Sequence, residues 1–588
     1  MRNNDHTKNA GRNLTTRTKK KFGCRLIANI EDEAKIQAYN RYLCRKVGGE
    51  MAFLDVPRSL IAEPRRFERA LFDGNVELPT DPKLRRQMVA DLIGAEPSEL
   101  IRHVAHVGFR NNCKTFALHD VVIGCAKENN RDLQPPLSIR EQRYQLKCKG
   151  ELKKWRAQVA SNARWSSRLT LVLAAGFAAP LIRLVGLQPF VIVLYGPSKS
   201  GKTTAMLAVA SMIGFGNDVE IPNWNMSSSA LAETGRLFND LPLIVDEIGA
   251  MDGKQKEARD KIRPLIFQYA TGATKAINSK STYAVPLAQN KAMGILLTTA
   301  ERSFDDYAQL AQEQRDAGEY ARAIDVPVLS GNRETIIDRF PKNLDDAKRP
   351  KWARQKLQEI RSGCSNHHGL AIKKYLKHLL DKETDELVGQ VEVNIEEFLQ
   401  KLRLDERDGV SGHVARNFAV IYAGGLLAIE AGLLTIKRLK LERSLVSCFK
   451  ASIKQVRTPQ TIEKAAARKL MKQLKNAQLP TKEKAAREQK PVGFRAICKS
   501  TGQVDHYAVS GNTMKAWFPD ETELQAVITW LHRKELLLLK KGASFPSGKF
   551  SVGAVQTTEK LSGRKDETRT NERWIRFKDP QRAFSKRC

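Results

Sequence analysis

The chain has 588 residues, too many for one compact core, and its 41% hydrophobic and 28% charged residues are ordinary for a globular protein of roughly three to five domains. Its net charge of +34 indicates an anionic partner, of which nucleic acid is the commonest and an anionic membrane surface is the alternative. The most apolar stretch, Leu169 to Ile182, contains Pro180 and is shorter than the roughly 20 residues of a bilayer span, which argues against a membrane-spanning protein.

The chain opens with a basic segment, residues 1–22, which carries seven basic residues and one acidic residue and is predicted to be a disordered arm. It lacks the apolar core of a signal peptide. The nine cysteines of the chain are scattered and form no C-x-x-C pair, which argues against a zinc ribbon and against a disulfide framework. We therefore expect reduced thiols and a cytoplasmic location.

Residues 23–150 are predicted to form a small α/β domain. A helix is expected over Asp81 to Leu92, capped by Thr80 or Asp81 and with Pro82 in its first turn. A short apolar run, Thr115 to Ile123, predicts a strand.

Residues 151–365 have the pattern of a parallel α/β core. Helical periodicity runs from Leu152 to Leu187 and ends at Pro189. Three continuous apolar runs are typical of buried parallel strands, and a helix, Thr203 to Ile213, follows the first of them. The runs are Phe190 to Tyr195, Leu241 to Asp246 and Gly294 to Thr299.

Residues 366–435 are predicted to be helical, with small residues from Asn417 to Ala431 that allow close helix packing. Residues 436–491 are basic and poor in aromatics, which predicts a surface helix and linker. Residues 492–588 regain aromatics and are predicted to form an α+β module. A helix, Glu521 to Leu539, followed by strand-like runs at Lys549 to Val552 and Arg573 to Arg576 favours a winged-helix-like module that binds DNA.

The strongest motif is Gly196-Pro-Ser-Lys-Ser-Gly201-Lys202-Thr203, which fits G-x-x-x-x-G-K-[ST] between a predicted strand and a predicted helix. Such a loop wraps nucleotide phosphates with backbone N–H groups, while Lys202 reaches the β and γ phosphates and the Thr203 hydroxyl binds Mg²⁺. The residues predicted to bind ATP here are Gly196, Pro197, Ser198, Lys199, Ser200, Gly201, Lys202, Thr203 and Thr204.

An acidic pair, Asp246-Glu247, ends the second predicted strand. An Asp at the carboxyl end of a strand can hold Mg²⁺, and the adjacent Glu can polarise the attacking water. An acidic pair at an ordinary strand end is the alternative. After the phosphate-binding motif, we interpret Asp246 as a Mg²⁺ ligand and Glu247 as catalytic.

Further candidates rest on position. Arg322 comes late in the core and could reach the γ phosphate of a neighbouring subunit, or form a surface ion pair. Arg416, on a later helix, could contact nucleotide from a lid. Lys275 and Lys280 lie in a polar stretch that could face a pore and bind nucleic acid, or be a solvated turn.

Four aromatic and histidine positions are assigned to structure rather than function. His367-His368 lacks partners at metal-ligand spacing, and Trp517 and Phe518 are interpreted as core residues rather than base-stacking platforms.

The order of these motifs resembles the AAA+ ATPase family catalogued as domain of unknown function nine hundred and twenty-seven, which occurs in plasmids, prophages and cassette elements. The resemblance spans about residues 50 to 435. It is carried by Ala174 to Ile182, the loop, Trp224, Leu231 to Glu233, Asn239-Asp240, Val245 to Glu247, Leu297 to Glu301, Gly318 to Pro327, His368-Gly369 and Arg416 to Gly432.

The resemblance implies an AAA+ P-loop NTPase core with a helical lid, and similarity to MCM-like replicative helicases. It further implies a homohexameric ring, ATP hydrolysis between subunits, DNA translocation, and replication proteins of the mobile element as partners. In AAA+ ATPases a polar residue at Thr299 contacts the γ phosphate or the water; a strand-end threonine bonded to its own backbone is the alternative. The chain departs from the family at Thr298 to Glu301 and at Gly318 to Arg322. A loader or initiator that does not unwind DNA, and a nucleotide-gated scaffold, are the rival functions.

Overall fold

The computed structural model divides the chain into two compact units, of which the first ends at Gln455 and the second begins at Val456. It describes residues 23–32, 38–104, 106–124, 127–128, 131–135, 146–248, 255–271, 292–311, 313, 315–329, 333–402, 404, 409–454, 456, 459–487, 491–540, 543–546, 551–559 and 573–583. Each unit is considered by itself.

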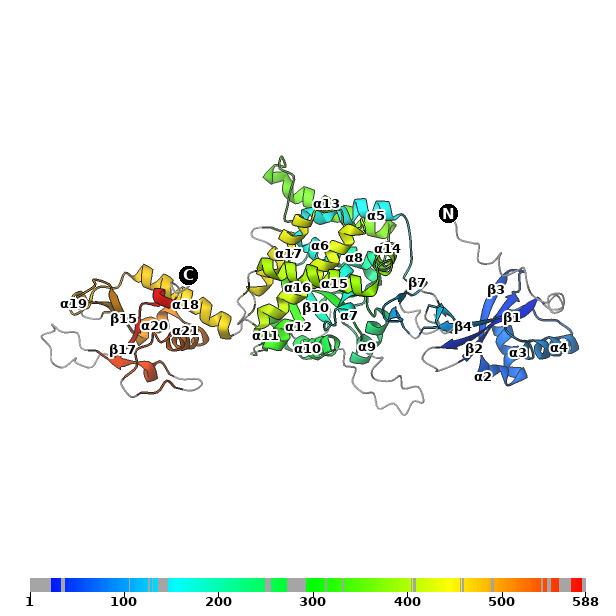
Figure 1. The fold of residues 1–588 in the computed structure, drawn as a ribbon, viewed down its shortest axis with the longest axis horizontal. Coiled ribbons are helices and arrows are strands. Elements are labelled where there is room, and N and C mark those ends of the chain that lie inside the picture. Colours follow the sequence, from blue (N-terminus) through cyan, green and yellow to red (C-terminus); the bar gives the residue numbers. More distant parts are fainter. Residues whose placement is uncertain are drawn as a thin grey trace. The chain divides into compact units, whose positions relative to one another are not determined.

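The first unit begins with a six-stranded sheet in the order β3-β2-β1-β4-β9-β8. Three short helices cover one of its faces, where Leu26 and Tyr42 pack against Phe67 and Met88 (Figure 1). The elements are β1 (Cys24–Asp32), β2 (Ala38–Arg45), β3 (Met51–Pro57), α2 (Arg58–Ile61), α3 (Pro64–Asp73), α4 (Pro82–Ile93), β4 (Glu99–His103), β8 (Lys127–Glu128) and β9 (Arg131–Gln134). The helix α4 is capped by Asp81, whose carboxylate accepts from the Lys83 amide.

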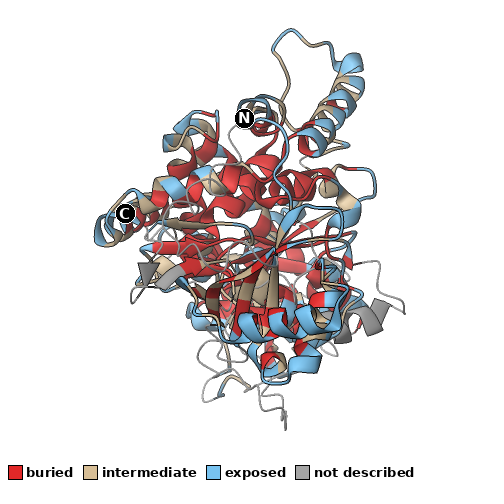
Figure 2. Ribbon diagram, turned by 90° about the vertical axis from the view of Figure 1, so that its right-hand side faces the viewer, coloured by how far each residue is buried: buried red, intermediate tan, exposed pale blue. Residues whose placement is uncertain are grey.

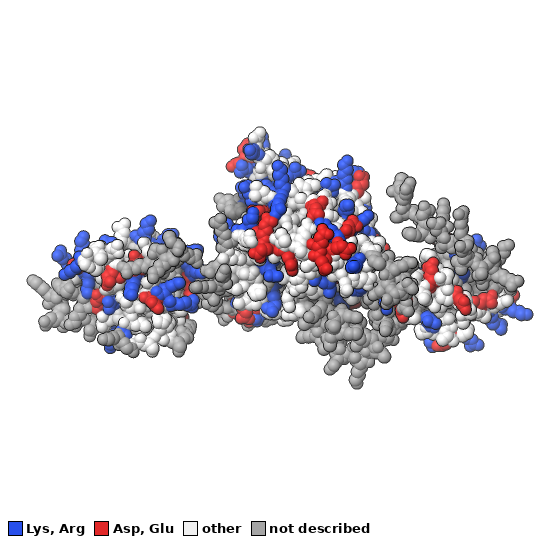
Figure 3. All heavy atoms as spheres, viewed as in Figure 1, with Lys and Arg blue, Asp and Glu red and all other residues white. Residues whose placement is uncertain are grey.

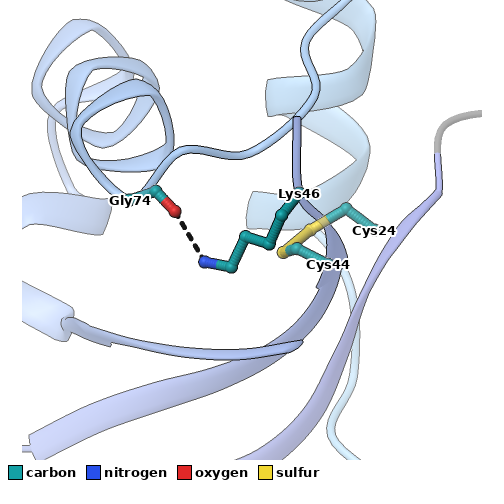
Figure 4. The surroundings of a disulfide bond; sticks show 4 residues. All are labelled: Cys24, Cys44, Lys46 and Gly74. Carbon is teal, nitrogen blue, oxygen red and sulfur yellow. Dashed lines mark hydrogen bonds between the residues drawn. A yellow bond between two sulfur atoms is a disulfide. The ribbon is translucent and has the colours of Figure 1, made fainter. Parts of the chain in front are cut away.

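A disulfide in this sheet corrects the expectation of reduced thiols for one pair of cysteines, whereas the other five cysteines among the described residues are free. Cys24 and Cys44 lie opposite each other in the antiparallel register of β1 and β2, with their Cα atoms 4.1 Å apart (Figure 4). Beside the pair, Lys46 Nζ donates to the Gly74 carbonyl at 2.6 Å. The two cysteines are twenty positions apart, and only the strand pairing, which the sequence analysis did not predict, brings them together.

A small antiparallel sheet replaces the single strand predicted over Thr115 to Ile123. The run forms two strands, β6 (Thr115–Ala117) and β7 (Val122–Gly124), joined by a turn in which the Leu118 amide donates to the Val121 carbonyl. The polar residues His119 and Asp120 occupy that turn. With β5 (Gly108–Arg110) these strands make a sheet that bonds to the core, because the Phe109 amide donates to Asp240 at 3.0 Å.

The core of the unit is a parallel sheet in the order β11-β12-β10-β13. Its strands are β10 (Phe190–Tyr195), β11 (Leu243–Val245), β12 (Ile295–Ala300) and β13 (Ala323–Pro327), so the three predicted apolar runs all contain strands. Nearly all residues of these strands are buried. Figure 2 shows such buried residues running through the interior elements of the molecule, with exposed residues on the outer helices.

Helices enclose this sheet. The helical segment predicted over Leu152 to Leu187 is divided into several helices, because the Ser166 hydroxyl caps a new helix by accepting from the Leu169 amide and Pro180 begins another. The helices before and between the strands are α5 (Leu152–Gln158), α6 (Ser167–Ala178), α7 (Leu181–Leu184), α8 (Lys202–Ile213), α9 (Ser228–Leu237), α10 (Gln255–Thr271), α11 (Phe304–Leu310) and α12 (Ala317–Arg322).

Five further helices complete the first unit: α13 (Arg349–Asn366), α14 (Ala371–Leu380), α15 (Thr384–Leu402), α16 (Gly409–Glu430) and α17 (Arg438–Ile453). The predicted close packing of small residues occurs between α16 and α6, where a Cβ on Gly424 would lie 2.6 Å from the backbone of Ala178. The helix α17 buries Leu441 and Leu445 in the same core as the parallel sheet. α17 is therefore a helix, as part of the segment 436–491 was predicted to be, but one of its faces is buried in the core.

The second unit contains an antiparallel sheet in the order β14-β15-β17-β16, with helices packed around a core that includes Phe518 and Trp530. Its elements are α18 (Pro459–Ala477), α19 (Lys482–Ala485), β14 (Gly493–Ile497), β15 (Val504–Ser510), α20 (Gly511–Trp517), α21 (Glu521–Arg533), β16 (Thr557–Thr558) and β17 (Arg573–Lys578). The helix α18 packs on α21, so the segment predicted as a surface helix and linker supplies α17 to the first unit and α18 and α19 to the second.

Two predictions within this module differ from the structure. The helix predicted to reach Leu539 ends at Arg533, because Glu535 takes a φ of 56° and Leu537 bridges to Phe577 of β17. The predicted strand at Lys549 to Val552 is also wrong in its described part, because Val552 begins a short 3-10 helix. Among the described residues, no helix combines the length and the apolarity needed to cross a bilayer.

Candidate functional site

The candidate site lies at one edge of the parallel sheet. Because β10, β11 and β12 run parallel, the residues that follow each of them meet at the same edge. The register places Tyr195 opposite Ala300 and Val245 opposite Thr298. This brings together the phosphate loop (Gly196 to Thr203) and the acidic pair (Asp246-Glu247), which are more than forty positions apart.

The phosphate loop depends on backbone angles that favour glycine. Gly196 has a φ of 152° and Gly201 a φ of 96°. A Cβ on Gly196 would collide with Val328, and one on Gly201 would lie 3.0 Å from Leu357. Gly201 begins α8, which has no side-chain cap, so the first N–H groups of this helix are free to bind an anion.

Lys202 folds back over the loop. Its Nζ donates to the carbonyls of Gly196 at 2.7 Å and Pro197 at 2.9 Å. Burial lowers the pKa of Lys202, and the carboxylates of Glu301, Glu247 and Asp246 oppose part of this shift. The ammonium therefore stands near acidic groups contributed by the ends of two other strands.

The acidic pair is fixed by the neighbouring strand. The buried Thr299 hydroxyl donates to Asp246 Oδ1 at 2.7 Å and accepts from the Glu247 amide at 3.2 Å. Glu247 has a φ of 46° and an exposed side chain. Thr298 has a different role, because its hydroxyl accepts from Trp224 Nε1 at 2.7 Å. Thr299 rather than Thr298 is thus the polar residue of β12 that contacts the acidic pair.

The residues of this edge fit a magnesium nucleotide. Ser200 is buried in the loop, and its Oγ has no hydrogen-bond partner among the described residues. Thr203, in the first turn of α8, and Asp246 supply the hydroxyl and carboxylate oxygens that Mg²⁺ prefers. Among the described residues, no group of three or more His, Cys, Asp and Glu side chains is placed to hold a metal ion.

The segment after β13 completes the loop and was missed from the sequence. The Ile336 amide donates to the Ser200 carbonyl at 2.8 Å, and Ile336 and Leu357 both contact Gly201. These contacts join residues more than 130 positions apart, and no motif in the sequence marks them.

The two candidate arginines lie elsewhere. Arg322 ends α12, donates to the Gly318 carbonyl at 3.0 Å and stands 5.2 Å from the ring centroid of Phe267. Arg416 is exposed on α16, next to Asn417, whose side chain donates to the Ala321 carbonyl. Within the described part of the chain, neither arginine forms a hydrogen bond or ion pair with the phosphate loop or the acidic pair. Lys275 and Lys280 lie outside the described residues.

A buried arginine network holds α12 in place. Arg315 pairs with Asp325 of β13 at 2.7 Å and lies 3.7 Å from Asp305 of α11. It also donates to the carbonyls of Glu319 and Ala323. Burial raises the pKa of Asp325, and the charge of Arg315 opposes that shift. The network fixes the helix that ends in Arg322, and the sequence analysis did not identify it.

The paired histidines, His367 and His368, have structural partners. His367 Nδ1 accepts from the Glu151 amide at 3.1 Å, and His368 Nδ1 lies 3.0 Å from the Cys364 carbonyl oxygen. The first of these bonds ties the end of α13 to the start of α5, and the second lies at the end of α13.

Comparison with known proteins gives a family match over part of the chain. The family model described as "Domain of unknown function (DUF927)" matches residues 26–283, which include the phosphate loop and the acidic pair but fewer than half of the 588 residues. No curated protein matches the sequence.

Among solved structures, one described as "SCCmec type IV Cch - active helicase" is 15% identical with a TM-score of 0.55, and the match covers 89% of this chain and 91% of that chain. The chain therefore shares the α/β fold of that structure. Another, described as "The A form apo structure of NrS-1 C terminal region-CTR", is 10% identical over 73% of this chain and 91% of that one. Its TM-score of 0.23 is too low to support an argument about fold.

Proposed function

We propose that the protein is an ATP-hydrolysing motor of the AAA+ class that acts on DNA. The observation that supports this best is the convergence of Lys202, Thr299 and the acidic pair at the end of one parallel sheet. A phosphate loop alone serves kinases and switches as well, whereas a carboxylate held beside it suits hydrolysis.

The roles of the residues follow from their positions. Backbone N–H groups from Gly196 to Thr203 bind the phosphates, and Lys202 exchanges its two carbonyl partners for the β and γ phosphates. Thr203 and Asp246 hold Mg²⁺, which neutralises phosphate charge when bound. Glu247, exposed and held by its backbone amide, orients a water and accepts its proton.

We propose that the active state is a homohexamer. In that assembly Arg322 or Arg416 acts on the nucleotide of a neighbouring subunit, which is consistent with their lack of contacts to the site in their own subunit. A homohexamer acting in the cytoplasm in the replication of a mobile element agrees with the resemblance of the sequence and with the name of the similar solved structure.

The C-terminal unit is proposed to bind DNA as a winged-helix-like module. Arg468, Lys472 and Lys475 are exposed on α18 at spacings of four and three, so they share one face of that helix. We call these residues the α18 stripe. Among the described residues they have no acidic partner, and phosphate groups would supply one. Figure 3 shows Lys and Arg over both units and a cluster of Asp and Glu on the visible face of the first unit.

A strand-displacement assay on a forked DNA duplex tests the motor. The wild type is expected to displace the strand with ATP, and Lys202→Ala to abolish displacement while leaving the protein folded. ATP turnover that DNA stimulates without displacement would instead support a loader or initiator. Negligible turnover that Glu247→Gln does not change would support a nucleotide-gated scaffold.

A further inference from the structure

A cavity of about 650 Å³ opens on the first unit, and no residue of the phosphate loop lines it. One wall is a face of α17 that carries Arg443, Lys450 and Lys454. The other walls come from Pro327 at the end of β13 and from Arg168 of α6. We call this cavity the α17 groove.

The α17 groove is strongly basic. Five of its lining side chains are cationic and one, Glu442, is acidic. Glu442 is paired with Lys401 at 3.4 Å, and Arg168 lies 3.5 Å from Asp338. Each of these two acidic side chains is therefore already paired with a basic side chain of the groove.

The remaining three cations have no acidic partner among the described residues. Arg443, Lys450 and Lys454 are all exposed. Lys450 and Lys454 stand four positions apart on one helix, a spacing at which like charges repel by roughly 0.2–0.5 kcal/mol. An anion in the groove would relieve this repulsion.

One cation of the groove is built into its wall. Arg168 is 2% exposed, and its Nε donates to the Pro327 carbonyl at 2.9 Å. This bond fixes the guanidinium in the wall, where Asp338 offsets part of its charge, so the unpaired positive charge of the groove comes from Arg443, Lys450 and Lys454.

The spacing of the three free cations favours a polymer of phosphates. At 1.5 Å per helical residue, Lys450 and Lys454 are separated by roughly 6 Å along the axis, and Arg443 and Lys454 by roughly 16 Å. One phosphate cannot reach all three. The volume is within the range of small-molecule clefts, which favours a single strand over the wider duplex.

We propose that the α17 groove binds the phosphate backbone of single-stranded DNA. This inference rests on the proposed function, since it names the part of the ATPase unit that contacts the DNA. It places that contact on a helix outside the predicted Lys275 and Lys280 positions and outside the C-terminal unit.

The test compares two triple variants of the full chain. The groove variant carries Arg443→Gln, Lys450→Gln and Lys454→Gln. The control variant carries Lys351→Gln, Lys374→Gln and Lys377→Gln, which removes the same charge from exposed positions of α13 and α14. Binding of a labelled thymidine oligonucleotide is followed by fluorescence anisotropy from 50 to 200 mM salt.

The expected result is a change in the salt dependence. Each lost contact with a single-strand phosphate lowers the slope of log K against log[salt] by about 0.7, so the groove variant should lose about two units of slope. ATP turnover without DNA should stay at the wild-type rate, because none of the three residues lies in the phosphate loop. If the groove variant and the control variant bind DNA alike, the proposal is overturned.

Two further measurements keep the outcome decisive. Lys450→Glu alone, at an exposed position, should weaken DNA binding at 100 mM salt by more than tenfold, and wild-type binding would count against the proposal. Inorganic tripolyphosphate is titrated into Lys202→Ala, with and without the three groove substitutions. If the groove substitutions abolish saturable binding of tripolyphosphate but leave DNA binding unchanged, the groove is a site for small anions and the proposal is overturned. Failure of the proposed function appears separately, as absent ATP turnover with the DNA slopes intact.

Discussion

Replacing Thr299 with valine removes one hydroxyl from the candidate site and leaves its shape unchanged. That hydroxyl donates to Asp246 at 2.7 Å and accepts from the Glu247 amide at 3.2 Å. A hydrogen bond to a carboxylate contributes roughly 1.5–3 kcal/mol and one to a neutral group roughly 0.5–1.5 kcal/mol. The Glu247 amide keeps Asp246 Oδ1 as an acceptor at 3.0 Å, so the second loss is small.

Thr299→Val should therefore remove about 2 kcal/mol of the interaction that orients the acidic pair. Because roughly 1.4 kcal/mol corresponds to a tenfold change in rate, ATP turnover should fall by about 10–100-fold. Nucleotide affinity should change little, because the phosphate loop is untouched. Steady-state turnover and the Kd of a fluorescent ATP analogue measure the two effects. Thr299→Ser, which keeps the hydroxyl, is the matched control. Equal turnover in the valine and serine variants would refute the reasoning.

Three other substitutions test the phosphate loop, the arginine network and an ion pair of the second unit. Gly201→Ala puts a Cβ at a φ of 96° and 3.0 Å from Leu357. We expect the free energy of unfolding to fall by roughly 1–2 kcal/mol and ATP to bind more weakly, as measured by thermal unfolding and by titration. Wild-type values would contradict the loop geometry. Arg315→Met removes the ion-pair partner of the buried Asp325 and should lower the free energy of unfolding by roughly 3–5 kcal/mol. The loss should be seen as faster hydrogen exchange in α12, and unchanged exchange would show that the network does not hold this helix. Protonated His506 donates from Nε2 to the Glu559 carboxylate at 3.0 Å, and this bond raises the pKa of His506. The stabilisation from this bond is therefore present below pH 6.5 and is lost as pH rises through the raised value. Hydrogen exchange of β15, corrected for intrinsic rates, should therefore speed up at high pH in the wild type, and His506→Gln should remove that dependence; identical pH profiles would show that His506 does not contribute.

Local sequence patterns predicted the parts of the fold that depend on local chemistry. Continuous apolar runs marked β10 and the first half of β12 because buried parallel strands are mostly apolar on both faces. The phosphate loop was located because its two glycines stand where the backbone takes positive φ angles, which other residues rarely adopt. Asp81 marked the start of α4 because its carboxylate bonds the first free amide of the helix.

Contacts between distant segments were not predictable in the same way. The Cys24–Cys44 pair depends on the register of two strands. The many basic residues of α17 indicate an exposed helix in the sequence, although its apolar residues are buried in the core. Thr299 was a candidate from its place at the strand end, but its bond to Asp246 and the bond of Thr298 to Trp224 depend on which face of β12 meets the acidic pair, and that requires the order of the strands. The arginine network joins three elements whose charges look like ordinary surface residues in the sequence.

The central claim is that the acidic pair and the phosphate loop form one hydrolytic site. The most direct measurement is ATP turnover with Mg²⁺ in the wild type and in Glu247→Gln, with ATP affinity measured alongside. The account predicts turnover in the wild type, its loss by at least about 100-fold in the variant, and unchanged binding of ATP. Equal turnover in the two proteins, or none in a wild type that binds ATP, would contradict it.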